Sequence, residues 1–349
     1  MVRAPWKIVA LLGFCHAVSD CTAGYLLGGY GFQRTWYDSG AMLLLYNVLA
    51  FGGQLPWAVW IDRKGWHRSS LSISLVLMAL SMVLVGSLEG DWVVPLAVFL
   101  AGNASALFHV SGGGMVLHAT QGNAGAAGLF AGPGVIGLAV GGWLAWQSWE
   151  VHLILAAVLI LAWLVQSQLE IQSVQLESGS QEQHGLDHHD FAMLLVLLII
   201  AMRSAIWTMW EQIMHGDYEM WFSVAVAASF GKILGGFLAI RWGLGRWVMM
   251  TLASSSLLLQ FGESNPYLLL GGVALLQSST GPALSMLSRT LPQQPATASA
   301  MGLGLAIAAG GLPFLLGWEM DPFWTMPVLA VGLLLLGLLA RFKSGAFTR

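Results

Sequence analysis

Long apolar windows follow one another along almost the whole chain, and they constrain its fold more than any other feature. A membrane-spanning helix needs about 20 consecutive, mostly apolar residues. Twelve windows meet this description, at residues 6–30, 39–61, 69–87, 92–117, 124–146, 149–167, 191–214, 220–240, 246–262, 266–288, 297–318 and 322–341. Because lipid offers no hydrogen-bond partners, each spanning segment must satisfy its backbone within a helix. The sequence therefore predicts an all-α integral membrane protein with twelve transmembrane helices.

The composition argues against a soluble enzyme and against nucleic-acid binding. Charged residues make up 9% of the chain, compared with about 25% in a soluble domain, and the mean hydropathy is +0.72. The short links leave no room for a soluble catalytic domain, and the sequence has no basic face for nucleic acid. The first apolar run is too long for a signal peptide and contains His16 and Asp20, so we expect it to be retained.

The distribution of Lys and Arg predicts the direction in which the helices run. With the N-terminus inside, eleven Lys and Arg residues fall on the inner side and only Arg34 falls on the outer side. Arg203 and Lys232 lie within predicted spans. Because the inner loops of membrane proteins carry the excess of positive residues, we expect both termini to be cytoplasmic and the protein to lie in the cell (inner) membrane.

An internal repeat divides the chain near its midpoint. A shift of 178 residues pairs Arg63 with Arg241, Gly65 with Gly243, and Arg68 with Arg246. The same shift aligns residues 131–133 with residues 309–311, whereas chance matching of Gly and Arg at helix ends would give no common offset. Parallel repeats of this kind place a substrate site between the halves. The predicted parts are a six-helix bundle at 1–167, a cytoplasmic acidic linker at 168–190 and a second six-helix bundle at 191–349.

The link after the second span resembles a signature of the major facilitator superfamily. In that signature a small residue and three apolar residues precede Asp-Arg-x-Gly and further basic residues. The chain has, in these places, Ala58, Asp62, Arg63, Gly65 and Arg68. Ala58 replaces the usual glycine, and Trp66 and His67 depart from the basic pattern. The resemblance covers nearly the whole chain and implies the major facilitator fold, with two pseudo-symmetric six-helix bundles.

Residues 128–142 resemble the Gly-Pro motif in the fifth span of proton-linked exporters of that superfamily. The resemblance implies a gating role for Gly132 and Pro133.

A narrower resemblance is to the fosmidomycin-resistance-type exporters. Their first span carries His-x-x-x-Asp-x-x-x-Gly, and this chain has His16, Asp20 and Gly24. Their fourth span has a small-residue run that ends in Phe-His-Pro. This chain has Phe108 and His109, followed by Val110 in place of the proline.

The link after the second span is also the predicted gate. A carboxylate and guanidinium groups at the inner mouth can lock one half against the other and separate when the protein opens inward. The groups concerned are Asp62, Arg63, Arg68 and Arg241, with Gly65 at the turn. The second half has Ile240 where Asp62 stands, so only the first half supplies the carboxylate. Simple anchoring by positive charge is the alternative interpretation.

Three titratable side chains of the N-terminal half are the predicted proton carriers. His16 and Asp20 are four residues apart, so they share one helix face, and His109 of the fourth span is a candidate third member. A charged group at the bilayer centre costs roughly 2.5–3.5 kcal/mol on insertion scales, and histidine titrates near neutral pH. One alternative is that Asp20 only offsets a buried cation. The alternative for His109 is a packing role.

The cations of the C-terminal half are the predicted substrate site. Arg203 and Lys232 lie well inside the seventh and eighth spans, where they would attract an anionic or zwitterionic organic solute. Trp207 and Trp210 could stack on the substrate, with packing as the alternative. Glu211 lies two turns beyond Arg203, nearer the outer mouth.

These features predict a secondary active transporter, with proton-coupled export of a small, drug-like organic solute as the leading interpretation. An importer or uniporter of an organic anion fits the same features. An intramembrane enzyme and a non-transporting receptor are further alternatives, although the sequence has no nucleophile elbow and no His-Glu-x-x-His pair. The expected partners are substrate, protons and lipid, with a monomeric protein, no cofactor and no metal. The histidines at 184, 188 and 189 are interpreted as part of a solvated tether.

Overall fold

The computed structural model describes residues 6–30, 39–168, 188–213 and 218–315, and these parts of the chain are helical apart from short links. The first half comprises α1 (Trp6–Tyr30), α2 (Ser39–Asn47), the π-helix η1 (Val48–Gly52), α3 (Gln54–Lys64), α4 (His67–Ser87), α5 (Val93–Ala119), α6 (Ala124–Trp146) and α7 (His152–Ser167). The second half comprises α8 (His188–Ile213), α9 (Tyr218–Trp242), α10 (Leu244–Leu259), α11 (Pro266–Gln277), α12 (Thr280–Thr290), α13 (Pro295–Ala300), the π-helix η2 (Met301–Leu305) and α14 (Ala306–Leu315).

The helices match the apolar windows closely. Eight helical segments within the described ranges are long and apolar enough to cross a membrane, and the shorter helices α7 and α10 fall on two further windows. The pair α11 and α12 covers the window at 266–288. The all-helical membrane class is therefore confirmed, whereas the window at 322–341 lies outside the described residues and the total of twelve stays a prediction.

Two predicted spans are interrupted by a single turn of π-helix. η1 joins α2 to α3, and η2 joins α13 to α14. The two π-helical turns come from opposite halves of the chain and pack against each other. Such turns are rare and are frequent at functional sites. The π-helical turns of both spans therefore lie where the halves meet.

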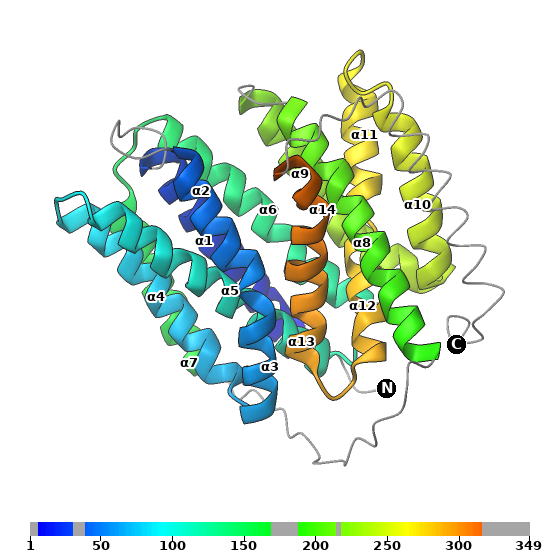
Figure 1. The fold of residues 1–349 in the computed structure, drawn as a ribbon, viewed down its shortest axis with the longest axis horizontal. Helices are drawn as coiled ribbons and strands as arrows, with labels where there is room; N and C mark the ends of the chain where they lie inside the picture. The colour runs from blue at the N-terminus through cyan, green and yellow to red at the C-terminus, as the bar shows by residue number, and fades with distance from the viewer. Residues whose placement is uncertain (1–5, 31–38, 169–187, 214–217, 316–349) are drawn as a thin grey trace.

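The helices form two groups that correspond to the two halves of the chain. Figure 1 shows α1–α7 on one side and α8–α14 on the other, with their lower ends together and α2 and α9 apart at the upper end. The view from below shows α6 lying beside α9 and α13 beside α5. The division into 1–167 and 191–349 stays a prediction, because the arrangement does not test these boundaries.

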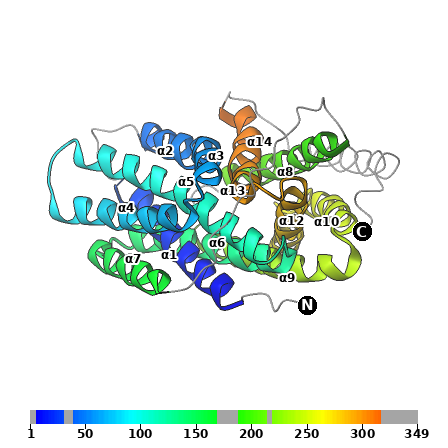
Figure 2. The same cartoon turned by 90° about the horizontal axis from the view of Figure 1, so that it is seen from below.

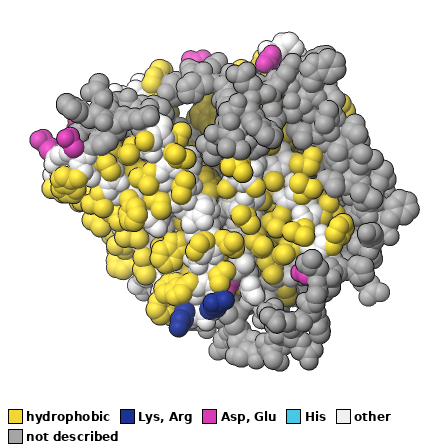
Figure 3. All heavy atoms as spheres, in the orientation of Figure 1, with side chains coloured by type: hydrophobic (Ala, Val, Ile, Leu, Met, Phe, Trp, Pro, Cys, Tyr) yellow, Lys and Arg dark blue, Asp and Glu magenta, His cyan; other side chains and the backbone are white. Residues whose placement is uncertain are grey.

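The exterior of the molecule is apolar. Figure 3 shows hydrophobic side chains over most of the described surface, with the visible Lys and Arg side chains gathered at the lower edge. Large side chains such as Phe14, Ile154 and Phe230 are exposed. Such a surface would be costly in water and suits a lipid environment.

Candidate functional site

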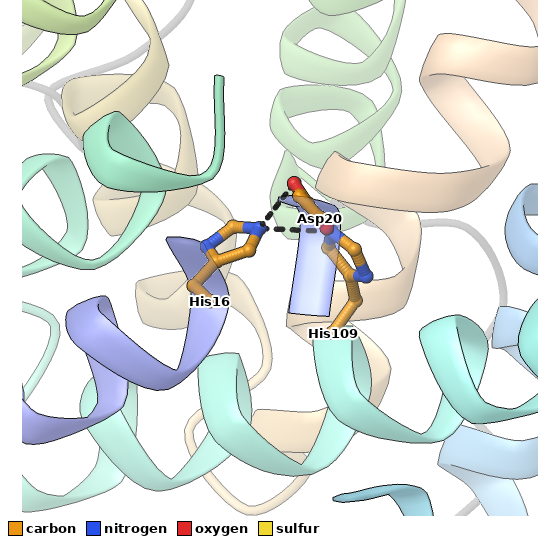
Figure 4. Close-up of side chains that lie close together, drawn as sticks. All are labelled: His16, Asp20 and His109. Atoms are coloured by element: carbon orange, nitrogen blue, oxygen red, sulfur yellow. Dashed lines mark hydrogen bonds and ion pairs between the residues drawn. The ribbon is translucent and has the colours of Figure 1, made fainter. Parts of the chain in front are cut away.

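His16, Asp20 and His109 form one compact cluster inside the N-terminal half. His16 and Asp20 follow each other by one turn on α1, and His109 comes from α5 (Figure 4). His16 Nε2 lies 3.0 Å from His109 Nε2 and 3.2 Å from Asp20 Oδ2, and His109 Nε2 lies 4.0 Å from Asp20 Oδ1. The side chains of His16, Asp20 and His109 are 5%, 16% and 12% exposed, respectively. The predicted third member is therefore in contact with the other two.

Backbone carbonyl groups fix the orientation of both imidazole rings. His16 Nδ1 donates a hydrogen bond of 2.8 Å to the carbonyl oxygen of Phe130 on α6. His109 Nδ1 donates a hydrogen bond of 2.8 Å to the carbonyl oxygen of Ser105, one turn earlier on α5. A carbonyl oxygen only accepts, so each ring carries a proton on Nδ1. Each Nε2 is then an acceptor when its ring is neutral.

The facing Nε2 atoms lack a donor between them when both rings are neutral. Two neutral imidazoles would point lone pairs at each other across 3.0 Å, with a carboxylate oxygen 3.2 Å from one of them. A buried acceptor without a donor costs about 1–3 kcal/mol. One proton between the two Nε2 atoms would supply the missing donor. This geometry suits a bound proton, and the role of the cluster as proton carrier stays a prediction.

Helix α6 supplies the space in which this cluster lies. A Cβ atom at Gly134 would lie 2.6 Å from both Asp20 Oδ2 and His16 Nε2, so any side chain there would displace the pair. The preceding residue, Pro133, lies inside α6 and has no N–H to donate to the carbonyl of Leu129. Gly132 faces the other half, where a Cβ would lie 2.6 Å from the side chain of Ile233. Gly132 and Pro133 thus lie between the cluster and the second half, and their gating role stays a prediction.

The two predicted cations of the C-terminal half lie close to each other. Arg203 on α8 is buried and donates hydrogen bonds to Gln277 (3.1 Å) and to the hydroxyl of Thr280. Lys232 on α9 is partly buried and makes no hydrogen bond or ion pair within the described residues. Lys232 lies within electrostatic range of Arg203 and also of Asp20 in the other half. Within the described residues the Lys232 amine therefore has no fixed partner, and its role in substrate binding stays a prediction.

The aromatic candidates are placed differently. Trp207 packs against Trp221 of α9, with ring centroids 5.8 Å apart. Trp210 is 1% exposed and packs against Gly262, in the link between α10 and α11. This placement favours the packing interpretation of Trp210, and its role in binding stays a prediction. The side chain of Glu211 lies outside the described part of the chain.

At the lower end of the molecule Asp62 bridges the two halves. It is 3% exposed and accepts hydrogen bonds from the backbone N–H groups of Ala296 (3.1 Å) and Thr297 (2.8 Å) at the start of α13. It also accepts from the Thr297 hydroxyl (2.7 Å) and from His67 Nε2 (3.0 Å). A carboxylate at a helix N-terminus is stabilised by the helix dipole. Asp62 is the carboxylate that the sequence assigned to the gate.

The partners of Asp62 differ from the predicted ones. The sequence suggested guanidinium groups, but Arg63 and Arg241 are exposed and make no ion pair among the described residues. Arg68 donates to the carbonyl of Ser167 at the end of α7, within its own half. Gly65 ends α3 in the left-handed conformation (φ 67°), which turns the chain back so that His67 reaches Asp62. An imidazole and a helix N-terminus take the place of the guanidinium groups.

Comparisons by sequence give no match to a protein-family profile and none to a curated protein. Solved structures do match. The E. coli fucose:proton symporter FucP (N162A) is 14% identical with a TM-score of 0.73, covering 98% of this chain and 99% of that one. The structure of FucP described as a major facilitator superfamily transporter in the outward conformation is 14% identical with a TM-score of 0.75, covering 99% of each chain. This chain has the major facilitator fold.

The fold implied by the Asp62–Arg68 link is therefore confirmed, whereas its division into two six-helix bundles stays a prediction. The narrower resemblance, to fosmidomycin-resistance-type exporters, stays a prediction.

Several residues of the site were not identified from the sequence. Gly134 and the carbonyls of Phe130 and Ser105 could not be identified from the local sequence. The role of a backbone group depends on which side chain lies against it in the folded protein. His67, which bonds Asp62, did carry a signal, since it departs from the basic pattern. Thr297, another partner of Asp62, lies 235 positions from it in the sequence.

Proposed function

We propose that the protein is a secondary active transporter that exports a small organic anion or zwitterion in exchange for protons, by alternating access. The observation that carries this proposal is the His16–Asp20–His109 cluster in one half, within electrostatic range of the unpaired Lys232 in the other half. A proton on one side of the interface and an anion on the other would influence each other directly. That mutual influence is the requirement for coupled transport.

The hydrogen bonds at the lower end support alternating access. Asp62 and the start of α13 hold the halves together there. We assign the lower end to the cytoplasm, because the Lys and Arg side chains on this face gather there. Both termini and the linker 168–190 would then be cytoplasmic. In the described arrangement the site would open to the outside.

The coupling ion follows from the need of the cluster for a cation. With both Nδ1 atoms bonded to carbonyls, a proton on the Nε2 atoms bonds His16 to His109. A substrate anion at Lys232 would attract that positive charge, which by itself favours joint movement of proton and substrate. Exchange requires in addition that the proton-bound and substrate-bound states compete. Proton release into the cytoplasm and substrate departure to the outside would complete an exchange cycle.

The substrate class follows from the cations. Arg203 and Lys232 are both costly to keep within a membrane protein. Lys232 has no partner among the described residues, whereas Arg203 is held by Gln277 and Thr280. We therefore infer that a carboxylate, phosphonate or similar anionic group binds at Lys232, with Arg203 supporting it at longer range. Trp207 and Glu211 complete the proposed binding set.

A second candidate is symport, in which proton and substrate enter together. The name of FucP, a fucose:proton symporter, favours this direction of coupling for a protein of the same fold. The same cluster and cations would serve symport, as they would an importer of an organic anion. The proposed form is in either case a monomer in the inner membrane, with two six-helix halves at 1–167 and 191–349.

Reconstitution into proteoliposomes tests the proposal. A pH-sensitive dye inside the vesicles would report proton movement when carboxylate and phosphonate solutes are added outside, with and without a pH gradient. We expect substrate-driven proton movement in the wild type and its loss in Asp20→Asn. The matched control is Cys21→Ser, the neighbouring buried position on α1. Wild-type proton movement in Asp20→Asn would refute the coupling role, and the sign of the movement separates antiport from symport.

A further inference from the structure

We propose that His16, Asp20 and His109 also form a binding site for a divalent first-row transition metal ion, such as Zn²⁺ or Co²⁺. The sequence predicted no metal site. The proposal concerns equilibrium binding to the folded protein and does not depend on the direction or substrate of transport. A metal ion and a proton would compete for the same Nε2 lone pairs. Bound metal would therefore block the proposed proton site.

The spacing of the ligand atoms fits such an ion. Bonds of about 2.0–2.1 Å from zinc to nitrogen or oxygen place two ligands of a tetrahedral site about 3.3 Å apart. The three contacts within the cluster are 3.0 Å, 3.2 Å and 4.0 Å. One ligand atom from each of His16, Asp20 and His109 can be chosen so that all lie within 4.8 Å of one another. A small adjustment of the Asp20 carboxylate would centre an ion among them.

The backbone hydrogen bonds prepare both rings for metal binding. A histidine that binds a metal through one nitrogen almost always donates its other N–H to a carbonyl or a carboxylate. His16 Nδ1 donates to Phe130 O and His109 Nδ1 donates to Ser105 O, at 2.8 Å each. Both Nε2 lone pairs are consequently directed inward, toward each other and toward Asp20 (Figure 4). The rings need no tautomer change to accept a metal.

Gly134 lets two of the ligand atoms lie directly against α6. A Cβ at this position would lie 2.6 Å from both Asp20 Oδ2 and His16 Nε2, so any side chain there would displace them. Within the described residues, the only ion pairs of Asp20 are those with the two histidines. Lys232 acts on the site at longer range and opposes a second positive charge.

The donor set determines which ions suit the site. Two imidazoles and one carboxylate suit zinc, cobalt, nickel, copper and ferrous iron, whereas calcium and magnesium prefer oxygen ligands alone. Three protein ligands leave at least one coordination position for water or a solute, as in sites that are not purely structural. We therefore expect Zn²⁺ and Co²⁺ to bind and Mg²⁺ to be excluded.

Metal titration of the purified full-length chain in detergent tests the proposal. The histidines at 184, 188 and 189, of which the last two begin α8, are first replaced by Ala, because they could bind metal independently. Calorimetry with Zn²⁺ is expected to give one ion per chain, and visible absorption with Co²⁺ is expected to show a low-symmetry, nitrogen- and oxygen-bound ion. Mg²⁺ should give no heat of binding.

Variants connect the signal to the cluster. His109→Ala should weaken Zn²⁺ binding by more than the roughly 10–100-fold that loss of an outer partner costs. The matched control is His118→Ala, an exposed histidine nine residues later on the same helix. A His109→Gln variant and a thermal unfolding curve separate loss of the ligand from loss of the fold. Unchanged binding in His109→Ala, equal weakening in His118→Ala, or no Zn²⁺ binding by the folded parent protein would overturn the proposal.

Discussion

At the scale of single residues, the cluster depends on groups that have no titratable chemistry of their own. The carbonyls of Phe130 and Ser105 decide which nitrogen of each histidine carries a proton. Gly134 decides whether His16 and Asp20 can lie against α6 at all. The polar side chains therefore specify what the site can bind, and the backbone around them specifies how the binding atoms are directed.

Replacing Gly134 with Ala is expected to impair the site without removing a polar group. The added Cβ would push Asp20 and His16 apart, since it would lie 2.6 Å from an atom of each. We expect substrate-driven proton flux in proteoliposomes to fall by on the order of tenfold to hundredfold, as for other small displacements of reacting groups. Gly142→Ala is the control on the same helix, because its Cβ would meet nothing within 4 Å. Equal flux in the two variants would contradict the positioning role.

At the scale of helices, close contact between the halves depends on small residues at the seam. A Cβ at Gly128 of α6 would collide with the carbonyl oxygen of Lys232, and a Cβ at Gly236 of α9 would collide with that of Ala124. Small residues let membrane helices approach closely where lipid provides no hydrophobic drive for association. The same approach brings Lys232 to the N-terminal half. Helix packing thus creates the electrostatic relation between the cluster and the cation.

The proposed gate belongs to the scale of helices, because it joins α3 to α13, and Asp62→Asn tests it. The substitution removes the negative charge that the N-terminus of α13 and His67 stabilise. Hydrogen bonds to charged groups contribute about 1.5–3 kcal/mol each, so losing one shifts the balance toward the inward-open form by roughly tenfold or more. Spin-label distances across the lower end would report that shift. Arg63→Gln, an exposed neighbour, should leave the distances unchanged, and identical distances in both variants would show that Asp62 is not a latch.

At the scale of the whole molecule, orientation is a prediction that accessibility can decide. We expect the linker 168–190 to face the cytoplasm and the α4–α5 link to face outward, because Lys and Arg gather on one side. In a background with Cys15 and Cys21 changed to Ser, Glu89→Cys should react with an impermeant maleimide in intact cells. Ser180→Cys should react only after the membrane is opened. The opposite pattern would invert the proposed assignment of the lower end.

The sequence by itself determined the class of this protein. Apolar windows of about 20 residues allow only helices in lipid, so the all-helical membrane architecture was predictable. The link from Asp62 to Arg68 indicated the superfamily fold, and the spacing of His16 and Asp20 placed two polar groups on one face of α1. Local patterns sufficed for these features because each depends on helix geometry or on the cost of placing polar groups in lipid.

Only the tertiary structure decided which groups meet. The contact of His109 with His16, the carbonyls that fix both rings and the bonds from Asp62 to α13 all join residues distant in sequence. Spacing along a helix is fixed by its geometry, whereas contacts between helices depend on how small residues and bends let them approach. The sequence therefore identified the polar residues that are costly to place in a membrane, but not the groups that they contact. The proposed gate and the proposed cation site both depend on these partners.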